Sequence, residues 1–254
     1  METSSAKRDI VVDLNQIAWK QAREGGRGYH FRVCLEGGAD GPEAMQVRLP
    51  GLDVPPHFHH ASQFQLLLGG SMQFSDRLME AISVHYTDHD VPYGPFKPDA
   101  EHSMLILHAK PGGYAPMSDK EARKMINARG REMEGCAREA RSEPLPGGGS
   151  CKTLVSDQSG VCAQIVECPA GAVFQGEAPV HGRYQLLLKG SVTVDGKRLG
   201  AESLRFVQGN EPEAPLVCGP DGATFMVLSY DQDAAKGYGG KAMDDVRTPP
   251  EQAH

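Results

Sequence analysis

Two histidines one residue apart, in a stretch patterned as a β-strand, constrain this chain more than any other feature. His57 and His59 lie within the segment that runs from Gly51 to Gly70. Because side chains alternate along a strand, both imidazoles lie on one face, roughly 6 to 7 Å apart. Neutral imidazoles at that spacing can bind a single borderline transition metal. The spacing therefore predicts half of a metal site.

The chain also contains an internal repeat. Three pairs of segments match: Gln63–Met72 with Arg183–Val192, Val84–Thr87 with Leu204–Val207, and Leu105–Leu107 with Met226–Leu228. The first two pairs share an offset of 120 residues, and the third needs one inserted residue. Agreement over separate segments predicts two copies of one structural unit.

Composition favours a β-rich protein and excludes some partners. Thirty glycines and 18 prolines in 254 residues, spread between short apolar runs, are typical of many short strands. A net charge of −7 gives no electrostatic footprint for nucleic acid or an anionic membrane. The opening residues lack the apolar core of a signal peptide, and no apolar run is long enough to span a bilayer, so we expect a cytoplasmic protein. The six cysteines lack a Cys-x2-Cys pair and are expected to be reduced thiols.

The segment from Gly51 to Gly70 resembles the first motif of the cupin superfamily, G-x5-H-x-H-x3-E-x6-G. Every glycine and histidine of that pattern is present, and Gln63 stands where cupins carry glutamate. The resemblance implies one divalent transition metal held by His57, His59 and Gln63. Iron is the first choice, and manganese, nickel, zinc and copper are the alternatives. For Gln63 two roles stay open: its amide oxygen can bind the metal weakly, or the amide can form hydrogen bonds inside the pocket.

Because the unit is duplicated, the chain resembles a bicupin, a protein with two cupin barrels in one chain. This resemblance implies an all-β fold of two cupin barrels, of the double-stranded β-helix or jelly-roll type, with a short connecting helix. The expected boundaries are an N-terminal arm at 1–27, an N-terminal barrel at 28–116, a helix and linker at 117–149, a degenerate C-terminal barrel at 150–232 and a flexible tail at 233–254. Ser118 and Glu121 form a capping box that predicts a helix reaching about Arg138, unless Gly130 or Gly135 ends it sooner.

Alternating and apolar runs predict the strands of both copies. In the first copy they are His30–Leu35, Ala44–Leu49, Gln63–Leu68, Ala81–Tyr86 and Met104–His108. In the second they are Cys162–Glu167, Tyr184–Leu188, Ser191–Val194, Ser203–Val207 and Thr224–Ser229.

Cupins usually take a third histidine from a second motif, and Tyr93 falls at that position. The departure removes an imidazole on which many cupin dioxygenases depend. A phenol there can be a metal ligand or a catalytic proton donor, or it can close a turn. Three other histidines could supply the third ligand: His102, which we place first, His89 and His85.

The second copy carries no comparable ligand set. Glu177, Pro179, Arg183 and Glu213 occupy the positions of His57, His59, Gln63 and Tyr93. We expect the second barrel to be structural.

Two hypotheses follow for function. The first is a metal-dependent enzyme, dioxygenase-like or an isomerase or lyase, that acts on a small oxygenated metabolite with a carbonyl or carboxylate group. The second is a non-catalytic cupin that binds a small ligand or serves as a scaffold or sensor. In both, the expected partners are a small molecule and a second copy of the chain in a homodimer.

Overall fold

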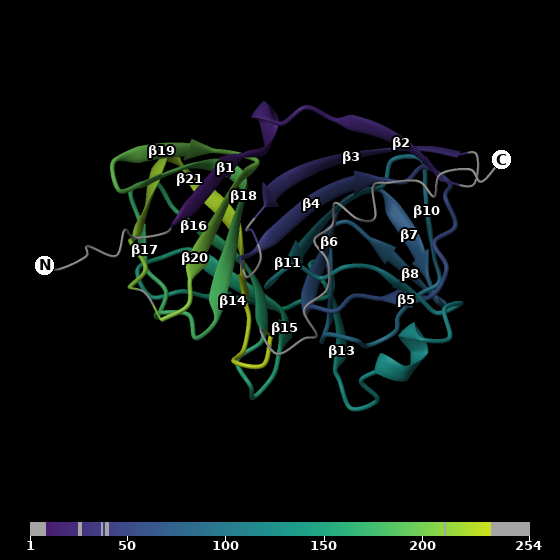
Figure 1. The fold of residues 1–254 in the computed structure, drawn as a ribbon. Coiled ribbons are helices and arrows are strands. Elements are labelled where there is room, and N and C mark those ends of the chain that lie inside the picture. Colours follow the sequence, from purple (N-terminus) through teal and green to yellow (C-terminus); the bar gives the residue numbers. More distant parts are fainter. Residues whose placement is uncertain (1–8, 25–26, 37, 39–40, 211, 235–254) are drawn as a thin grey trace, which may run out of the picture. The chain divides into compact units, whose positions relative to one another are not determined.

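The computed structural model describes residues 9–24, 27–36, 38, 41–210 and 212–234 (Figure 1). Within them the regular structure consists of strands and two short 3₁₀ turns, at Leu14–Gln16 and Ala122–Met125, which confirms the all-β class. None of the helical segments in these ranges has the length and apolarity that a membrane crossing requires. Nearly all of the predicted tail, 233–254, lies outside the described residues.

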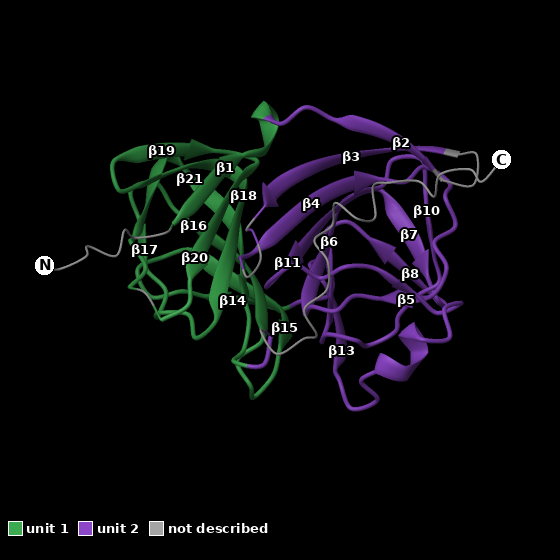
Figure 2. Cartoon of the chain, in the orientation of Figure 1, with its two compact units in different colours: residues 1–16, 141–232 green, residues 17–140, 233–254 purple. Residues whose placement is uncertain are grey.

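The chain divides into two compact units (Figure 2). Unit 1 comprises residues 1–16 and 141–232, and unit 2 comprises residues 17–140 and 233–254. The strands of unit 1 are β1 (Ile10–Asp13), β14 (Ser142–Pro144), β15 (Ser150–Ser156), β16 (Cys162–Cys168), β17 (Val173–Phe174), β18 (Gly182–Val194), β19 (Lys197–Gly200), β20 (Ser203–Gln208) and β21 (Leu216–Ser229). Those of unit 2 are β2 (Lys20–Glu24), β3 (Arg27–Glu36), β4 (Glu43–Arg48), β5 (His57–Phe58), β6 (Gln63–Gly69), β7 (Ser71–Phe74), β8 (Arg77–Glu80), β9 (Ser83–Thr87), β10 (Phe96–Pro98), β11 (Ser103–His108), β12 (Ala115–Pro116) and β13 (Glu132–Cys136).

Unit 2 contains a seven-stranded sheet in the order β13-β9-β6-β11-β4-β3-β2 and a three-stranded sheet, β10-β7-β8. Strands β5 and β12 form a further pair. One apolar core joins residues of the two larger sheets, with Phe31, Leu67 and Met104 from the first and Met72 and Phe74 from the second. Burial of this cluster gives a rigid frame for the polar residues described below.

Unit 1 contains a sheet in the order β1-β20-β18-β21-β16-β15-β14, with β17 on β21 and β19 on β18. The long strand β18 bends the chain at Gly190, which has a φ of 77°, and Gly70 in the other copy has a φ of 71°. A side chain at either glycine would run into backbone, at Gly222 and at Glu101 respectively. The repeated glycine thus marks a tight backbone approach in each copy.

The two copies pair their strands in the same register. Gln65 lies opposite His85, and Gln185 lies opposite Arg205. Further equivalent pairs are Leu66 with Leu105 and Leu186 with Met226, and Phe64 with Leu107 and Tyr184 with Leu228. The repeat in sequence is therefore a repeat in structure, at the level of individual residue pairs.

Each copy receives its edge strand from the segment that precedes the other copy. Strand β1 comes before the first copy in the chain, yet it pairs with β20 of the second. Strand β13 comes before the second copy, yet it pairs with β9 of the first. Strand β1, which lies within the predicted N-terminal arm, is therefore grouped with unit 1.

The predicted connecting helix is wrong. From Ser118 to Arg138 the chain forms the 3₁₀ turn Ala122–Met125 and then strand β13. The side chain of Asp119 accepts the amides of Glu121 and Ala122, so the local signal starts a turn but no helix. Five residues of β13 then pair with β9, and this long-range ladder outweighs a weak local helix preference.

The sheets are linear series of strands: within the described residues, no pairing closes either sheet into a ring. The architecture at this level is a pair of duplicated β units.

Candidate metal centre

The paired histidines of the sequence motif lie together in unit 2. His57 is in β5, where its backbone exchanges two hydrogen bonds with that of Tyr93, of 3.0 and 3.2 Å. His59 follows one residue after this strand, and the ring centroids of His57 and His59 are 5.3 Å apart. Phe58 and His60 contact each other at 5.4 Å, so alternation separates the two pairs as the sequence predicts.

The hydrogen bonds of His57 fix its tautomer. Its Nδ1 lies 2.8 Å from the carbonyl oxygen of Pro55, which can only accept, so Nδ1 carries the proton and Nε2 keeps its lone pair. The Nδ1 of His59 is buried and has no hydrogen-bond partner among the described residues. Burial lowers the pKa of His57 to about 4 and the pKa of His59 well below its usual range, with the neighbouring histidines adding to the effect. Both rings are therefore neutral at pH 7, as metal ligands must be.

Aromatic rings surround the pair. The ring centroid of Tyr93 lies 4.5 Å from that of His57 and 6.3 Å from that of His59. The ring centroid of Tyr114 lies 4.7 Å from that of His57 and 5.8 Å from that of His59. His108 in β11 lies 5.0 Å from His59. Tyr93 is almost fully buried, and burial raises the pKa of its phenol, so the hydroxyl keeps its proton.

A chain of hydrogen bonds runs beneath these rings. The amide nitrogen of Gln63 binds the Tyr93 hydroxyl at 2.9 Å and Thr87 at 3.2 Å, while its oxygen lies 3.0 Å from Nε2 of His108. Gln65 binds the same hydroxyl at 2.8 Å through its amide nitrogen.

The oxygen of Gln65 lies 2.9 Å from Nδ1 of His85, and Nε2 of His85 lies 3.0 Å from Glu132 in β13. Although burial acts against it, the hydrogen bond from His85 lowers the pKa of Glu132. The chain of contacts thus joins His108, Gln63, Tyr93, Gln65, His85 and Glu132.

The second copy holds a charged version of the same chain. Glu213, at the position of Tyr93, accepts from Arg183 at 2.6 Å and from the amide nitrogen of Gln185. Arg205, at the position of His85, donates to the oxygen of Gln185 at 2.9 Å and pairs with Asp9 at 2.5 Å. Arg183 also donates to Ser229, which stands at the position of His108.

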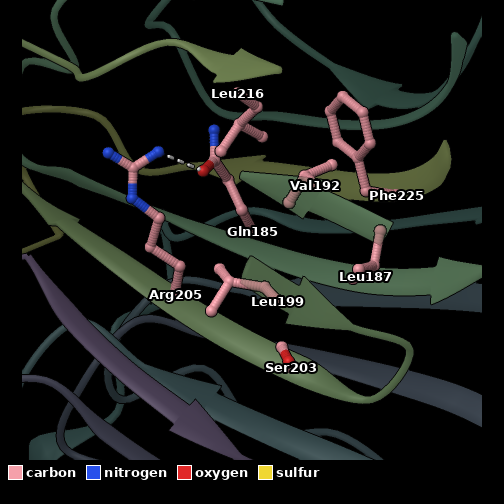
Figure 3. Close-up of a pocket in the computed structure, with 8 residues that line it drawn as sticks. All are labelled: Gln185, Leu187, Val192, Leu199, Ser203, Arg205, Leu216 and Phe225. Atoms are coloured by element: carbon pink, nitrogen blue, oxygen red, sulfur yellow. Dashed lines mark hydrogen bonds between the residues drawn. The ribbon is translucent and has the colours of Figure 1, made fainter. Parts of the chain in front are cut away.

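Figure 3 shows the bond between Arg205 and Gln185 at the edge of a cavity of about 10 Å³, which is room for about one water molecule. Apolar side chains such as Leu187 and Phe225 make up most of the lining. In each copy the outer carboxylate comes from the segment before the other copy: Glu132 begins β13, and Asp9 directly precedes β1.

The three alternative ligands, His89, His85 and His102, each contact other residues. Nδ1 of His89 binds one carboxylate oxygen of Asp90, and Nδ1 of His60 binds the other. Burial alone would raise the pKa of Asp90, but the bonds from these two rings lower it. His85 is engaged by Gln65 and Glu132.

His85 also belongs to the one group of three ligand-type side chains that meets a metal-binding distance among the described residues. Its ring and the carboxylates of Glu132 and Glu134 have atoms within 4.8 Å of one another. Glu134, however, pairs with Arg77 at 2.8 Å, and Glu132 pairs with His85 itself. Each group has a partner of opposite charge or a hydrogen bond, which accounts for the cluster without a metal.

His102 lies against Leu49, whose amide donates to its Nδ1 at 3.4 Å, and its buried Nε2 has no partner within the described ranges. Burial lowers its pKa to about 4, below the unfolded value, so protonation favours unfolding. We expect the free energy of unfolding to fall as the pH drops from about 6.5 towards 4. His102→Asn keeps an acceptor for the Leu49 amide but cannot titrate, so denaturant unfolding of this variant should depend less on pH in that window. An unchanged dependence would contradict this account.

Sequence reasoning missed several members of the site: His108, Gln65, Tyr114 and Glu132. His108 ends an apolar strand and lies directly opposite Gln63 in the register of β6 and β11. The repeat could have identified His108. The second copy carries Ser229 at the position of His108 and Arg183 at the position of Gln63, so these two residues change together.

No protein-family model and no curated protein sequence matches this chain. Several solved structures do. One is a provisionally named dioxygenase from Nostoc punctiforme, with a TM-score of 0.70 and 13% identity over 89% of this chain and 84% of that one. Oxalate decarboxylase of Bacillus subtilis, described with Mn(II) centres, matches with a TM-score of 0.61 and 12% identity over 91% and 78%.

Oxalate decarboxylase of Lactobacillus farciminis, in a complex with formate, matches with a TM-score of 0.62 and 11% identity over 91% and 88%. The likeness is one of fold. It agrees with the cupin resemblance of the first motif, and the chain's chemistry rests on its own residues.

Proposed function

We propose that the chain is a duplicated cupin whose first copy binds one divalent transition metal and acts on a small oxygenated metabolite. His57 and His59 are the metal ligands. The observation that carries this proposal is the pair of neutral imidazoles, one with its proton fixed on Nδ1 by Pro55 and the other with a buried Nδ1 that meets no partner in the part of the chain that the structure describes. Such an orphaned buried nitrogen costs free energy unless something binds it.

Of the three predicted ligands, Gln63 fits a metal less well than the two histidines. The oxygen of Gln63 faces Nε2 of His108, which leaves the amide better suited to hydrogen bonding than to ligation. Iron and manganese both suit imidazole ligands with open positions, and oxalate decarboxylase of Bacillus subtilis, a structural neighbour of this chain, has Mn(II) centres.

The protein's part in the reaction falls to Tyr93 and the aromatic rings. A bound metal would act as a Lewis acid towards a carbonyl or carboxylate oxygen. The buried hydroxyl of Tyr93 keeps its proton and can donate it to that oxygen, while Tyr93 and Tyr114 exclude water beside His57. This arrangement suits dioxygenase-like, isomerase or lyase chemistry. The second copy, with its internally neutralised ion pairs, is the structural half.

The test is metal analysis of protein purified without a histidine tag. We expect close to one equivalent of iron or manganese, and a fall in melting temperature when a chelator removes it, since a ligand that binds only the folded state stabilises that state. Little metal after incubation with excess Fe²⁺, Mn²⁺ or Ni²⁺, with no effect of the chelator, would refute the proposal.

A non-catalytic role is the second candidate, and one observation favours it. The side chains at the glutamate and third-histidine positions, Gln63 and Tyr93, bind each other at 2.9 Å. A protein of this kind would bind a small ligand between the aromatic rings without a metal. The homodimer and the cytoplasmic location remain proposals, and sedimentation of the purified chain tests the first of them.

A further inference from the structure

We infer that the interior hydrogen-bond chain is directional, and that it locks the Tyr93 hydroxyl as a donor towards the oxygen of a carboxylate or carbonyl ligand. His85 and His108 are the positioning residues that set this direction through Gln65 and Gln63. The inference deepens the proposed function and rests on it for the identity of the acceptor.

The direction is unambiguous in the second copy. The guanidinium of Arg205 can only donate, so it must donate to the oxygen of Gln185. The carboxylate of Glu213 can only accept, so it receives the amide nitrogen of Gln185 and the guanidinium of Arg183. The three bonds that join these four residues therefore point from positions 205 and 183 towards position 213.

For the Gln65 arm, the first copy places the same contacts at equivalent positions; in the other arm Gln63 turns an acceptor to position 108, where Arg183 of the second copy donates to Ser229. Gln65 occupies the place of Gln185, with its oxygen towards His85 and its nitrogen towards Tyr93. Gln63 uses both amide hydrogens, on Thr87 and on Tyr93, and turns its oxygen to His108. The bonds thus run from His85 and His108 through the two glutamines and meet at the Tyr93 oxygen. Because the carboxylate of Glu132 can only accept from Nε2 of His85, this direction places a proton on both ring nitrogens of His85, just as Arg205 donates to both Gln185 and Asp9.

The two copies differ in what stands at the meeting point. A carboxylate with two donors, as at Glu213, has no proton to give. A phenol that accepts two amide bonds still carries its own proton, and the described residues offer the Tyr93 hydroxyl no acceptor for it. The proton is left for a group that the protein does not contain, beside the ring of His57 at 4.5 Å. Two donors on its oxygen also make the hydroxyl a stronger donor.

The first test reads the direction without any metal-bound ligand. Histidine labelled with ¹⁵N, in metal-free or zinc-loaded full-length protein, reports which ring nitrogens carry protons, and His85→Gln and His108→Gln assign the signals. We expect a proton on Nδ1 of His85 and on Nε2 of His108. An unprotonated Nδ1 of His85, or an unprotonated Nε2 of His108, means reversed amides and overturns the inference, whatever the metal content.

The second test reads the donation. Acetate serves as the probe carboxylate, and calorimetry measures its affinity for the metal-loaded protein. Tyr93→Phe should weaken binding about tenfold or more, because it removes one hydrogen bond to a charged group. Tyr86→Phe is the matched control: its hydroxyl is also buried but binds Asp88 outside the network, so acetate affinity should not change.

A pair of His85 variants separates positioning from packing. His85→Arg installs the donor that the second copy uses, next to the carboxylate of Glu132, and should retain acetate affinity within about threefold. His85→Leu removes the donor and should reproduce much of the Tyr93→Phe loss. Equal affinity of the wild-type and Tyr93→Phe proteins, or no acetate binding by the wild type, overturns the donor role. A wild-type protein without metal refutes the proposed function instead, and the tautomer test still decides the direction.

Discussion

Glu213→Gln is expected to cause the largest loss of stability of any single polar substitution in the second copy, about 3 to 5 kcal/mol in the free energy of unfolding. The Glu213 side chain is fully buried and lies between Arg183, which is 12% exposed, and Arg205, which is 2% exposed. Removing its charge leaves two buried guanidinium groups with the charge of Asp9 alone nearby. Denaturant unfolding, followed by circular dichroism, measures the change.

Two controls sharpen this experiment. Glu121→Gln breaks an ion pair with Lys124 whose side chains are 78% and 69% exposed, and it should change stability by less than about 1 kcal/mol. The triple variant Arg183→Gln, Arg205→His, Glu213→Tyr installs the residues of the first copy, with no buried guanidinium group, and should recover part of the loss. A Glu213→Gln protein within about 1 kcal/mol of the wild type would show that the network contributes little.

The sequence predicted the strands because their signals are local. Apolar and alternating runs marked segments such as Gln63–Leu68 and Ser203–Val207, and the structure places β6 and β20 there. The repeat added the register, since residues that match in sequence also match in their cross-strand partners. Hydrophobic periodicity and internal similarity therefore predict the strands and their register within the sheets.

Strand β13 shows where local signals fail. The segment from Ser118 to Arg138 carries turn and helix signals, and its strand exists because β9, about 50 residues earlier, offers an unpaired edge. Strand β1 depends in the same way on β20, nearly 200 residues later. Neither partner can be inferred from composition, because pairing energy comes from residues distant in the chain.

The candidate site was predictable in part. Strand parity placed His57 and His59 on one face, and the structure brings their rings to 5.3 Å. Strand alternation does not predict the hydrogen-bond partners of the Tyr93 hydroxyl. These partners lie on β6 and are seen only in the three-dimensional structure.

A different comparison within the sequence would have found the network. Between the copies, Gln63, His85 and Tyr93 change together to Arg183, Arg205 and Glu213, so that both new cations pair with the new carboxylate. Compensated changes at matched positions of a repeat indicate contact. They are visible without any homologous sequence.

Loss of the metal in His57→Ala and His59→Ala is the second large effect that we expect. With two imidazoles as the protein ligands, removing either leaves one donor, so the protein should be purified with less than about a tenth of an equivalent of metal. Stabilisation by the metal should vanish with it: about 2.7 kcal/mol in the free energy of unfolding when free metal is at 100 times its dissociation constant.

His89→Ala is the matched control, because His89 is a nearby histidine held by Asp90 and should not affect the metal content. Elemental analysis of the three variants, and their melting temperatures with and without chelator, give the result. A His57→Ala protein with wild-type metal content, or a His89→Ala protein that loses its metal, would place the ion elsewhere. The orphaned nitrogen of His59 would then need another partner.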